Sequence, residues 1–256
     1  MLKAENICKK YGTQKAVDDV TLTVQDDIVT VIIGESGSGK STLARMLCYI
    51  ERPDSGKIIL NDTEIDRKTA KIQRRTVQLV MQDAASSLDP HQSAEQILDE
   101  PLKLLMILNR KSRRKRIAEL SDMVQFPIDK LRNKVSELSG GQQKRLCIAR
   151  ALAAEPQYII FDEAFSGLDV TLRSRILTML KALQKQLNTG SLIITHDLDT
   201  AMFMADRIYV MRSGKIIETL DKPKSLLDFK SGYAKELVRA AEYKRQALQN
   251  RKEEYL

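Results

Sequence analysis

The segment that most constrains the fold is a glycine-rich turn between two apolar runs, "TVIIGESGSGKSTLARMLCYIE" at residues 30–51. Residues 34–41 match G-x-x-x-x-G-K-[ST], a pattern that requires a strand before it and a helix after it. In such a turn the backbone N–H groups surround a β-phosphate, Lys40 reaches the β- and γ-phosphates, and Ser41 offers its hydroxyl to Mg²⁺. We therefore predict an α/β protein with a parallel-sheet core that binds a nucleoside triphosphate.

Two further apolar runs end in residues suited to phosphoryl transfer. "YIIFDE" (residues 158–163) ends in Asp162 and Glu163, and "SLIITHD" (191–197) contains His196 near its end. The reaction needs a metal ligand and a group that orients water, and parallel strands bring such residues to one edge of a sheet. We predict that Asp162 holds Mg²⁺ through its water shell and that Glu163 polarises the attacking water. His196 is predicted to contact the γ-phosphate and to hold Glu163 in line.

The stretch "ELSGGQQKRLCIARALAAEP" (137–156) predicts an amphipathic helix from Gln142 onward. Its first turn contains Ser139, Gly140 and Gly141, of which the glycines disfavour a helix interior and leave the first backbone N–H groups bare. A bare helix N-terminus binds anions, so we predict a second phosphate site here.

Composition indicates a soluble globular chain of 256 residues, long enough for one large domain or a domain with a subdomain. The apolar run at 29–34 is too short to cross a bilayer, and residues 1–12 lack the apolar core of a secretory signal. Isolated cysteines at positions 8, 48 and 147 suit a reducing compartment better than a disulfide framework or a metal site.

With these motifs in this order, the chain resembles the nucleotide-binding subunit of an ABC transporter over nearly its whole length. "LSGGQ" (138–142) matches the signature of that family. The resemblance implies that two subunits pack head to tail, so that the signature of one caps the γ-phosphate of ATP held by the other. It also implies that Tyr11 stacks on adenine, that Gln82 contacts Mg²⁺ or the water, and that Asp169 lies in a loop crossing the dimer interface. An ordinary edge-strand tyrosine is the alternative for Tyr11.

The predicted site therefore has three groups of residues, with ATP and Mg²⁺ as cofactors. The catalytic residues are Gln82, Glu163 and His196, and the metal ligands are Ser41, Gln82 and Asp162. The nucleotide-binding residues are Tyr11, Gly34, Glu35, Ser36, Gly37, Ser38, Gly39, Lys40, Ser41, Thr42, Ser139, Gly140, Gly141, Gln142 and Asp169.

The stretch "VMQDAASSLDPHQSAEQILDEPL" (80–102) resembles the corresponding segment of peptide and nickel importers, with Asp89 where an asparagine is usual. Residues 231–238 depart from the His-Pro-Tyr-Thr segment of that subfamily, which leaves the solute open. The resemblance implies an ATPase subunit at the cytoplasmic face of the membrane, powering import of peptides, nickel or a metal chelate. Its implied partners are a second, non-identical ATPase, two permease chains and, indirectly, a solute-binding protein.

The resemblance further implies a P-loop ATPase fold in a single domain, 1–256. The nucleotide-binding core is expected at 1–83 and 151–220, including an N-terminal antiparallel β-subdomain. The helical signature subdomain is expected at 84–150 and a helical tail at 221–256.

Two other functions stay open. A net charge of +8 and the basic run "NRKSRRKR" (109–116) permit a soluble ABC ATPase that acts on nucleic acid or the ribosome. A solvated helix start is the simpler interpretation of that run, and we expect no nucleic-acid partner. Lys40 and Ser139 are only 99 positions apart (139 − 40) without sustained heptads, unlike DNA-handling relatives. An ABC exporter is disfavoured only by the resemblance of residues 80–102.

Overall fold

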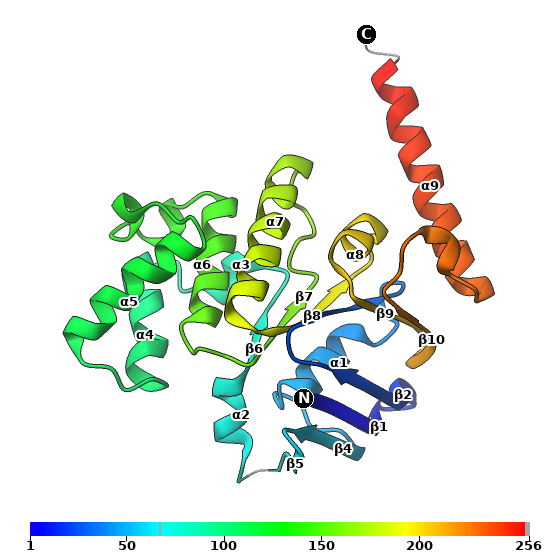
Figure 1. The fold of residues 1–256 in the computed structure, drawn as a ribbon, viewed down its shortest axis with the longest axis horizontal. Coiled ribbons are helices and arrows are strands. Elements are labelled where there is room, and N and C mark those ends of the chain that lie inside the picture. The colour runs from blue at the N-terminus through cyan, green and yellow to red at the C-terminus, as the bar shows by residue number, and fades with distance from the viewer. Residues whose placement is uncertain (67, 254–256) are drawn as a thin grey trace.

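The computed structural model describes residues 1–66 and 68–253 and builds them around two sheets (Figure 1). A four-stranded antiparallel sheet has the order β2-β1-β4-β5, and a six-stranded sheet has the order β10-β9-β3-β8-β7-β6. The strands are β1 (Leu2–Tyr11), β2 (Gln14–Val24), β3 (Val29–Ile33), β4 (Ser55–Leu60), β5 (Thr63–Glu64), β6 (Val77–Val80), β7 (Tyr158–Asp162), β8 (Gly190–Thr195), β9 (Arg207–Arg212) and β10 (Lys215–Asp221). In the larger sheet β6, β7, β8, β3 and β9 run parallel, and β10 closes one edge as the antiparallel arm of a hairpin.

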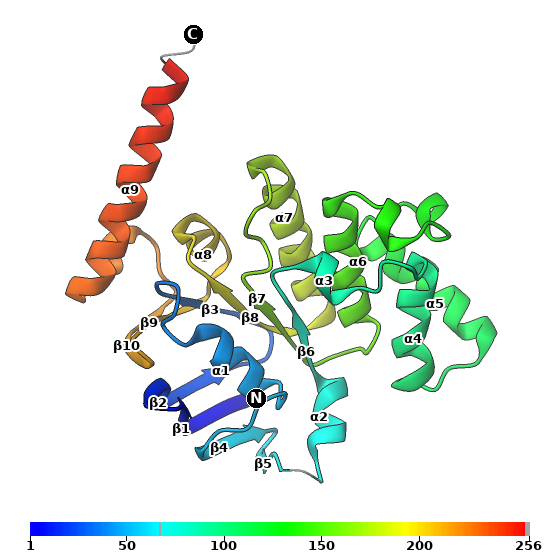
Figure 2. The same cartoon turned by 180° about the vertical axis from the view of Figure 1, so that it is seen from behind.

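Nine α-helices are described around the larger sheet in residues 1–66 and 68–253. They are α1 (Lys40–Leu47), α2 (Ala70–Thr76), α3 (Ala84–Ser87), α4 (Ala94–Leu104), α5 (Arg110–Met123), α6 (Gly140–Leu152), α7 (Val170–Leu187), α8 (Leu198–Met204) and α9 (Gly232–Glu253), with short 3₁₀ turns at Ile128–Lys130, Val135–Glu137 and Leu226–Asp228. Helices α3 to α6 gather at the end of the molecule remote from the antiparallel sheet, and α9 extends away from the body (Figures 1 and 2). None of the helices in the described residues is long and apolar enough to cross a membrane.

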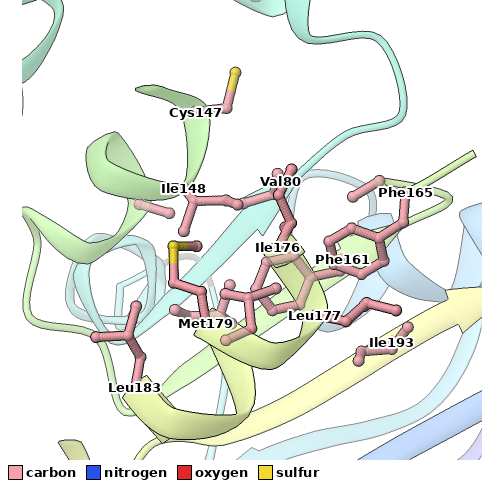
Figure 3. Close-up of a cluster of buried hydrophobic side chains, with 14 of the residues drawn as sticks. Val80, Cys147, Ile148, Phe161, Phe165, Ile176, Leu177, Met179, Leu183 and Ile193 are labelled. Carbon is pink, nitrogen blue, oxygen red and sulfur yellow. The ribbon is translucent and has the colours of Figure 1, made fainter. Parts of the chain in front are cut away.

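Strand residues are buried on both faces of the larger sheet, as expected for parallel strands covered on both sides. In β7, Ile160 packs in a cluster with α1 and the antiparallel sheet, whereas Ile159 and Phe161 belong to a cluster with α4 to α7. Figure 3 shows this second cluster, where Val80 and Phe161 meet side chains of α6 and α7. The alternation fixes the register of β7, because a shift by one residue would exchange its two faces.

The structure confirms the predicted fold class. The core is parallel, the N-terminal sheet is antiparallel, and the helices that precede residue 153 carry the "LSGGQ" segment. Strands β9 and β10 form a hairpin that turns at Ser213-Gly214. Of the predicted C-terminal helix, residues 254–256 lie outside the described residues.

Candidate functional site

A cavity of about 960 Å³ opens where the turn after β3 faces the ends of β6, β7 and β8. Ligands of open α/β sheets bind at this carboxyl edge of the strands. The predicted site residues that line the cavity are Tyr11, Gly34, Glu35, Ser36, Gly37, Gly39, Lys40, Ser41, Thr42, Gln82, Glu163 and His196. The phosphate loop and the residues at the ends of β6, β7 and β8 thus converge on one space although they lie far apart along the chain.

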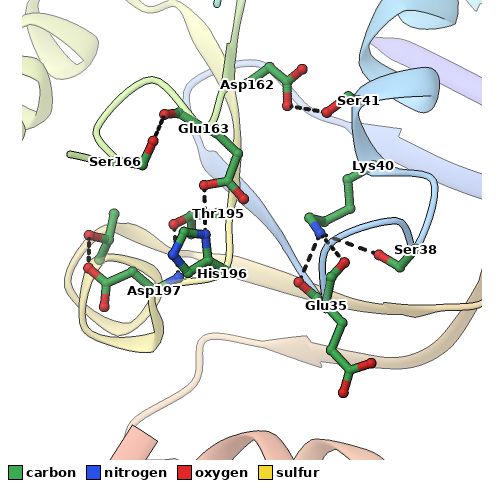
Figure 4. Close-up of polar contacts among 12 residues, drawn as sticks. Glu35, Ser38, Lys40, Ser41, Asp162, Glu163, Ser166, Thr195, His196 and Asp197 are labelled. Carbon is green, nitrogen blue, oxygen red and sulfur yellow. Dashed lines mark hydrogen bonds and ion pairs between the residues drawn. The ribbon is translucent and has the colours of Figure 1, made fainter. Parts of the chain in front are cut away.

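The turn between β3 and α1 holds the Lys40 ammonium inside its own loop. Lys40 is 5% exposed, and its Nζ donates to the backbone oxygens of Gly34 at 2.8 Å and Glu35 at 2.6 Å (Figure 4). Burial lowers the pKa of Lys40, while the carboxylates of Glu163 and Asp162 oppose that shift. The carbonyls keep the ammonium at the mouth of the loop, where phosphate oxygens could replace them.

Oxygen ligands for a small hard cation lie beside this turn. Ser41 Oγ donates to Asp162 Oδ1 at 2.9 Å (Figure 4), and burial raises the pKa of the Asp162 carboxyl. Gln82, in the loop after β6, lines the same cavity. Within the described residues no group of three or more His, Cys, Asp or Glu side chains could hold a metal alone. This sparse oxygen set fits Mg²⁺, which keeps waters and takes phosphate oxygens as further ligands.

Glu163 and His196 form a pair across two strand ends. His196 Nδ1 lies 2.9 Å from Glu163 Oε2, and the Glu163 side chain is 16% exposed (Figure 4). Glu163 has φ 49°, its N–H donates to Ile194 O of β8, and its own carbonyl accepts from Ser166 N and Oγ. These bonds hold the residue in a backbone region that non-glycine residues seldom occupy, so its carboxylate is fixed toward the histidine.

Sequence reasoning missed an ion pair in the wall of the cavity. Arg173 of α7 donates from Nη1 to Asp197 Oδ2 at 2.8 Å, and both residues line the cavity. Asp197 also caps α8 directly after His196. The available signal was the position of Arg173, one helical turn after Asp169.

Sequence reasoning also missed a contact of α9 with the phosphate loop. Tyr233 Oη accepts from the backbone N–H of Glu35 at 3.0 Å. The pattern of the sequence alone gave no indication of this contact, because it joins residues 198 positions apart.

The structure does not bring the "LSGGQ" segment to this cavity. Ser139 caps α6 and accepts from Gln142 N at 3.3 Å, while Gln142 Oε1 accepts from Ser139 N at 2.9 Å. The prediction that the first N–H groups of this helix are bare is therefore wrong for Gln142, because the capping box supplies its acceptor. Ser139 and Gly140 are exposed, and neither they nor Gly141 and Gln142 line the cavity. Asp169 lies outside it too and caps α7 by accepting from Leu172 N.

The next three side chains of α6 each bind two backbone carbonyls of a different segment. Gln143 Nε2 donates to Val135 and Leu138, and Arg145 Nη1 donates to Val124 and Gln125. Between them, Lys144 Nζ donates to Met81 O at 3.2 Å and Gln82 O at 2.7 Å. Burial lowers the pKa of Lys144. Helix α6 thus joins the approach to the signature, the end of α5 and the loop after β6.

The chain resembles known proteins over most of its length. A family model described as ABC transporter matches residues 17–166. The chain is 38% identical over 213 residues to the nickel import ATP-binding protein NikE of Shigella dysenteriae serotype 1 (strain Sd197) and to that of Escherichia coli (strain K12). Each alignment covers 82% of this chain and 80% of the relative.

Two solved structures share the fold. The structure of cbiO1 from Clostridium perfringens, described as part of the ABC transporter complex cbiONQ, gives a TM-score of 0.80 at 29% identity and covers 98% of each chain. The ATP-binding cassette MJ0796, a dimer in a post-hydrolysis state bound to ADP and Pi, gives a TM-score of 0.76 at 27% identity, covering 88% of this chain and 100% of that one. With a family model that spans more than half of the sequence and relatives at 38% identity, this chain belongs to the ABC transporter family, as one of its ATP-hydrolysing subunits.

Proposed function

We propose that this chain hydrolyses ATP to power the import of nickel, a metal chelate or peptides through a membrane transporter. One observation supports the proposal most strongly: the phosphate loop and the Glu163–His196 pair line one cavity, Asp162 binds Ser41 at its wall, and the "LSGGQ" helix begins outside it. A chain with one complete phosphate site and one separate anion site suits a motor that works as a pair of subunits.

In the proposed site, ATP occupies the cavity with its phosphates in the turn at 34–42. Phosphate oxygens replace the carbonyl partners of Lys40, whose charge then stabilises the negative charge of the transferred group. Tyr11, which is 46% exposed in the cavity wall, is available to stack on the adenine. Ser41, Asp162 and Gln82 would hold Mg²⁺, which neutralises charge on the β- and γ-phosphates when it is bound.

Glu163 is the proposed general base. Its carboxylate accepts a proton from, or orients, the water that attacks the γ-phosphorus, a role that needs a fixed direction. His196 supports it in two ways, because its Nδ1 binds the Glu163 carboxylate while its other nitrogen remains available to a phosphate oxygen.

The "LSGGQ" segment is proposed to act on a partner's nucleotide. Gly140 and Gly141 N–H groups have no acceptor among the described residues, and Ser139 is exposed beside them. Those donors suit a γ-phosphate presented by a second ATPase subunit packed head to tail, with Asp169 at the same interface. We propose that this second subunit is a non-identical ATPase and that two permease chains hold the pair at the cytoplasmic face of the membrane.

The cargo is proposed from the relatives. The NikE proteins, which match 82% of this chain, are named for nickel import. The segment at 80–102 has the sequence pattern typical of importers of nickel and of peptides.

The first test replaces the proposed base. We expect Glu163→Gln to bind ATP but to lower kcat about 100-fold, and to trap an ATP-bound dimer detectable by size-exclusion chromatography. Glu100→Gln, the same chemical change at an exposed position of α4, serves as the matched control and should hydrolyse ATP at the parental rate. Hydrolysis near the parental rate in Glu163→Gln would refute the assigned role.

The second test identifies the partners. The tagged chain is purified from gently solubilised membranes of its own cell, and the associated proteins are identified by mass spectrometry. We expect two permease chains and one further ATPase, and deletion of the chain should lower nickel accumulation or growth on peptides. Recovery of ribosomes or nucleic acid in place of permeases would contradict the transport role.

A further inference from the structure

The loop that carries Gln82 is held by a buried charge from the signature helix. Lys144 is 3% exposed, and its Nζ donates to the backbone oxygens of two successive residues, Met81 and Gln82. Both carbonyls accept from one ammonium, and Gln82 itself lines the nucleotide cavity.

The same helix binds Ser87, the last residue of α3, through two further side chains. Arg150 Nη1 donates to Ser87 O at 2.6 Å, and Cys147 Sγ lies 3.4 Å from Ser87 Oγ. Residues 81–87 are therefore attached to α6 at three points along successive turns, and we expect them to move with that helix as one body.

The distance between the two functional parts of α6 is short. Lys144 is five positions after Ser139, so these two residues lie about 7.5 Å apart along the axis of one helix. A rigid helix of this length transmits a displacement of its first turn directly to the loop that holds Gln82.

We propose that Lys144 is a positioning residue that sets Gln82 in its own nucleotide cavity and couples it to the nucleotide that a partner subunit presents to Ser139–Gly141. The proposal rests on the proposed function, since it requires a partner's ATP at the start of α6. Lys144 touches neither nucleotide and acts through the backbone of Gln82.

The test is a double-mutant cycle between Lys144→Met and Gln82→Ala in the assembled transporter. Methionine keeps an unbranched side chain, one atom shorter, but removes the N–H donors. We expect Lys144→Met alone to bind ATP within about twofold of the parent, to lower kcat about tenfold, and to require more Mg²⁺ for half-maximal rate. In the Gln82→Ala background, the same substitution should lower kcat less than twofold, because the group through which it acts is already absent.

Two further variants exclude a general loss of structure. Lys144→Arg restores N–H donors and should recover a part of kcat, whereas Lys111→Met, the same change at an exposed position of α5, should leave kcat unchanged. If Lys144→Met does not fold, the cycle is measured with Lys144→Gln, which keeps an amide donor on a shorter chain.

The outcomes separate this proposal from the proposed function. Glu163-dependent ATP hydrolysis and co-purification of permeases in the parent protein test the proposed function alone. With those intact, an equal loss of kcat from Lys144→Met in both backgrounds, or a loss that merely follows the melting temperature, would overturn the role of Lys144.

Discussion

Gly39 gives the sharpest test of why the phosphate loop has its sequence. Its φ of 101° lies in the region that side chains strongly disfavour, and a Cβ built there would stand 2.0 Å from the backbone oxygen of Ala16 in β2. Gly37 in the same loop also has a left-handed φ, 81°, but a Cβ there meets nothing within 4 Å. The two glycines therefore separate the cost of backbone strain from the cost of a collision.

The magnitudes follow from that difference. A non-glycine residue in a left-handed conformation costs about 1–2 kcal/mol, which is the whole expected penalty of Gly37→Ala. Gly39→Ala adds overpacking against a backbone atom, which cannot rotate away, and about 1–3 kcal/mol more is expected from it. We expect a total of about 2–5 kcal/mol for Gly39→Ala, and a displaced first turn of α1, where Lys40 and Ser41 begin the helix.

The measurement is urea denaturation of the two variants beside titration with a fluorescent ATP analogue. Gly37→Ala should stay folded and bind the analogue within about tenfold of the parent, the equivalent of 1.4 kcal/mol. Gly39→Ala should lose more unfolding free energy and bind at least tenfold more weakly than Gly37→Ala. Equal stability and affinity of the two variants would refute the argument that the approach of β2 demands glycine at position 39.

Two smaller predictions concern ion pairs, one in the wall of the cavity and one in the N-terminal sheet. Arg173→Gln should lower kcat about three- to tenfold with little change in KM for ATP, because Asp197 then loses the partner that steadies the loop after β8. Steady-state ATPase assays measure both constants, and an unchanged kcat would contradict the prediction. Hydrogen bonds from the N–H of Lys10 and then from the ammonium of Lys9 hold the pKa of Asp54 below its usual value. The contribution of the Asp54 carboxylate to stability is therefore complete above its unfolded pKa, about pH 4, and disappears as the pH falls through its lower folded pKa. The melting temperatures of the parent and Asp54→Ala should therefore differ most near neutral pH and converge in acid, and a constant difference would argue against the ion pair.

The parts of the site that the sequence predicted are those set by short local patterns. The turn at 34–41 dictates its own strand and helix, and apolar runs that end in Asp162 or His196 reveal strand ends without knowledge of their neighbours. The convergence of these residues on one cavity follows from the parallel sheet, whose strands all end at the same edge.

The parts that could not be predicted depend on contacts between distant segments. The bond from Lys144 to Gln82 spans 62 positions, and nothing in the helical periodicity distinguishes a lysine that is buried from one that faces water. The acceptor for Gln142 N was missed for a different reason. "SGGQ" contains the serine and the glutamine of a capping box, but its two glycines are equally typical of a turn with unpaired donors.

The order of the strands also sets the width of the catalytic space. Since β8 lies between β3 and β7, the phosphate loop and Glu163 begin two inter-strand spacings apart, about 10 Å. The strand order sets this spacing, and His196 follows the middle strand, β8, between the phosphate loop and the proposed base. A designer who transplants these loops onto another sheet should therefore keep one intervening strand. Adjacent strands would halve the distance between the phosphate loop and the glutamate, and no strand between them would carry the histidine.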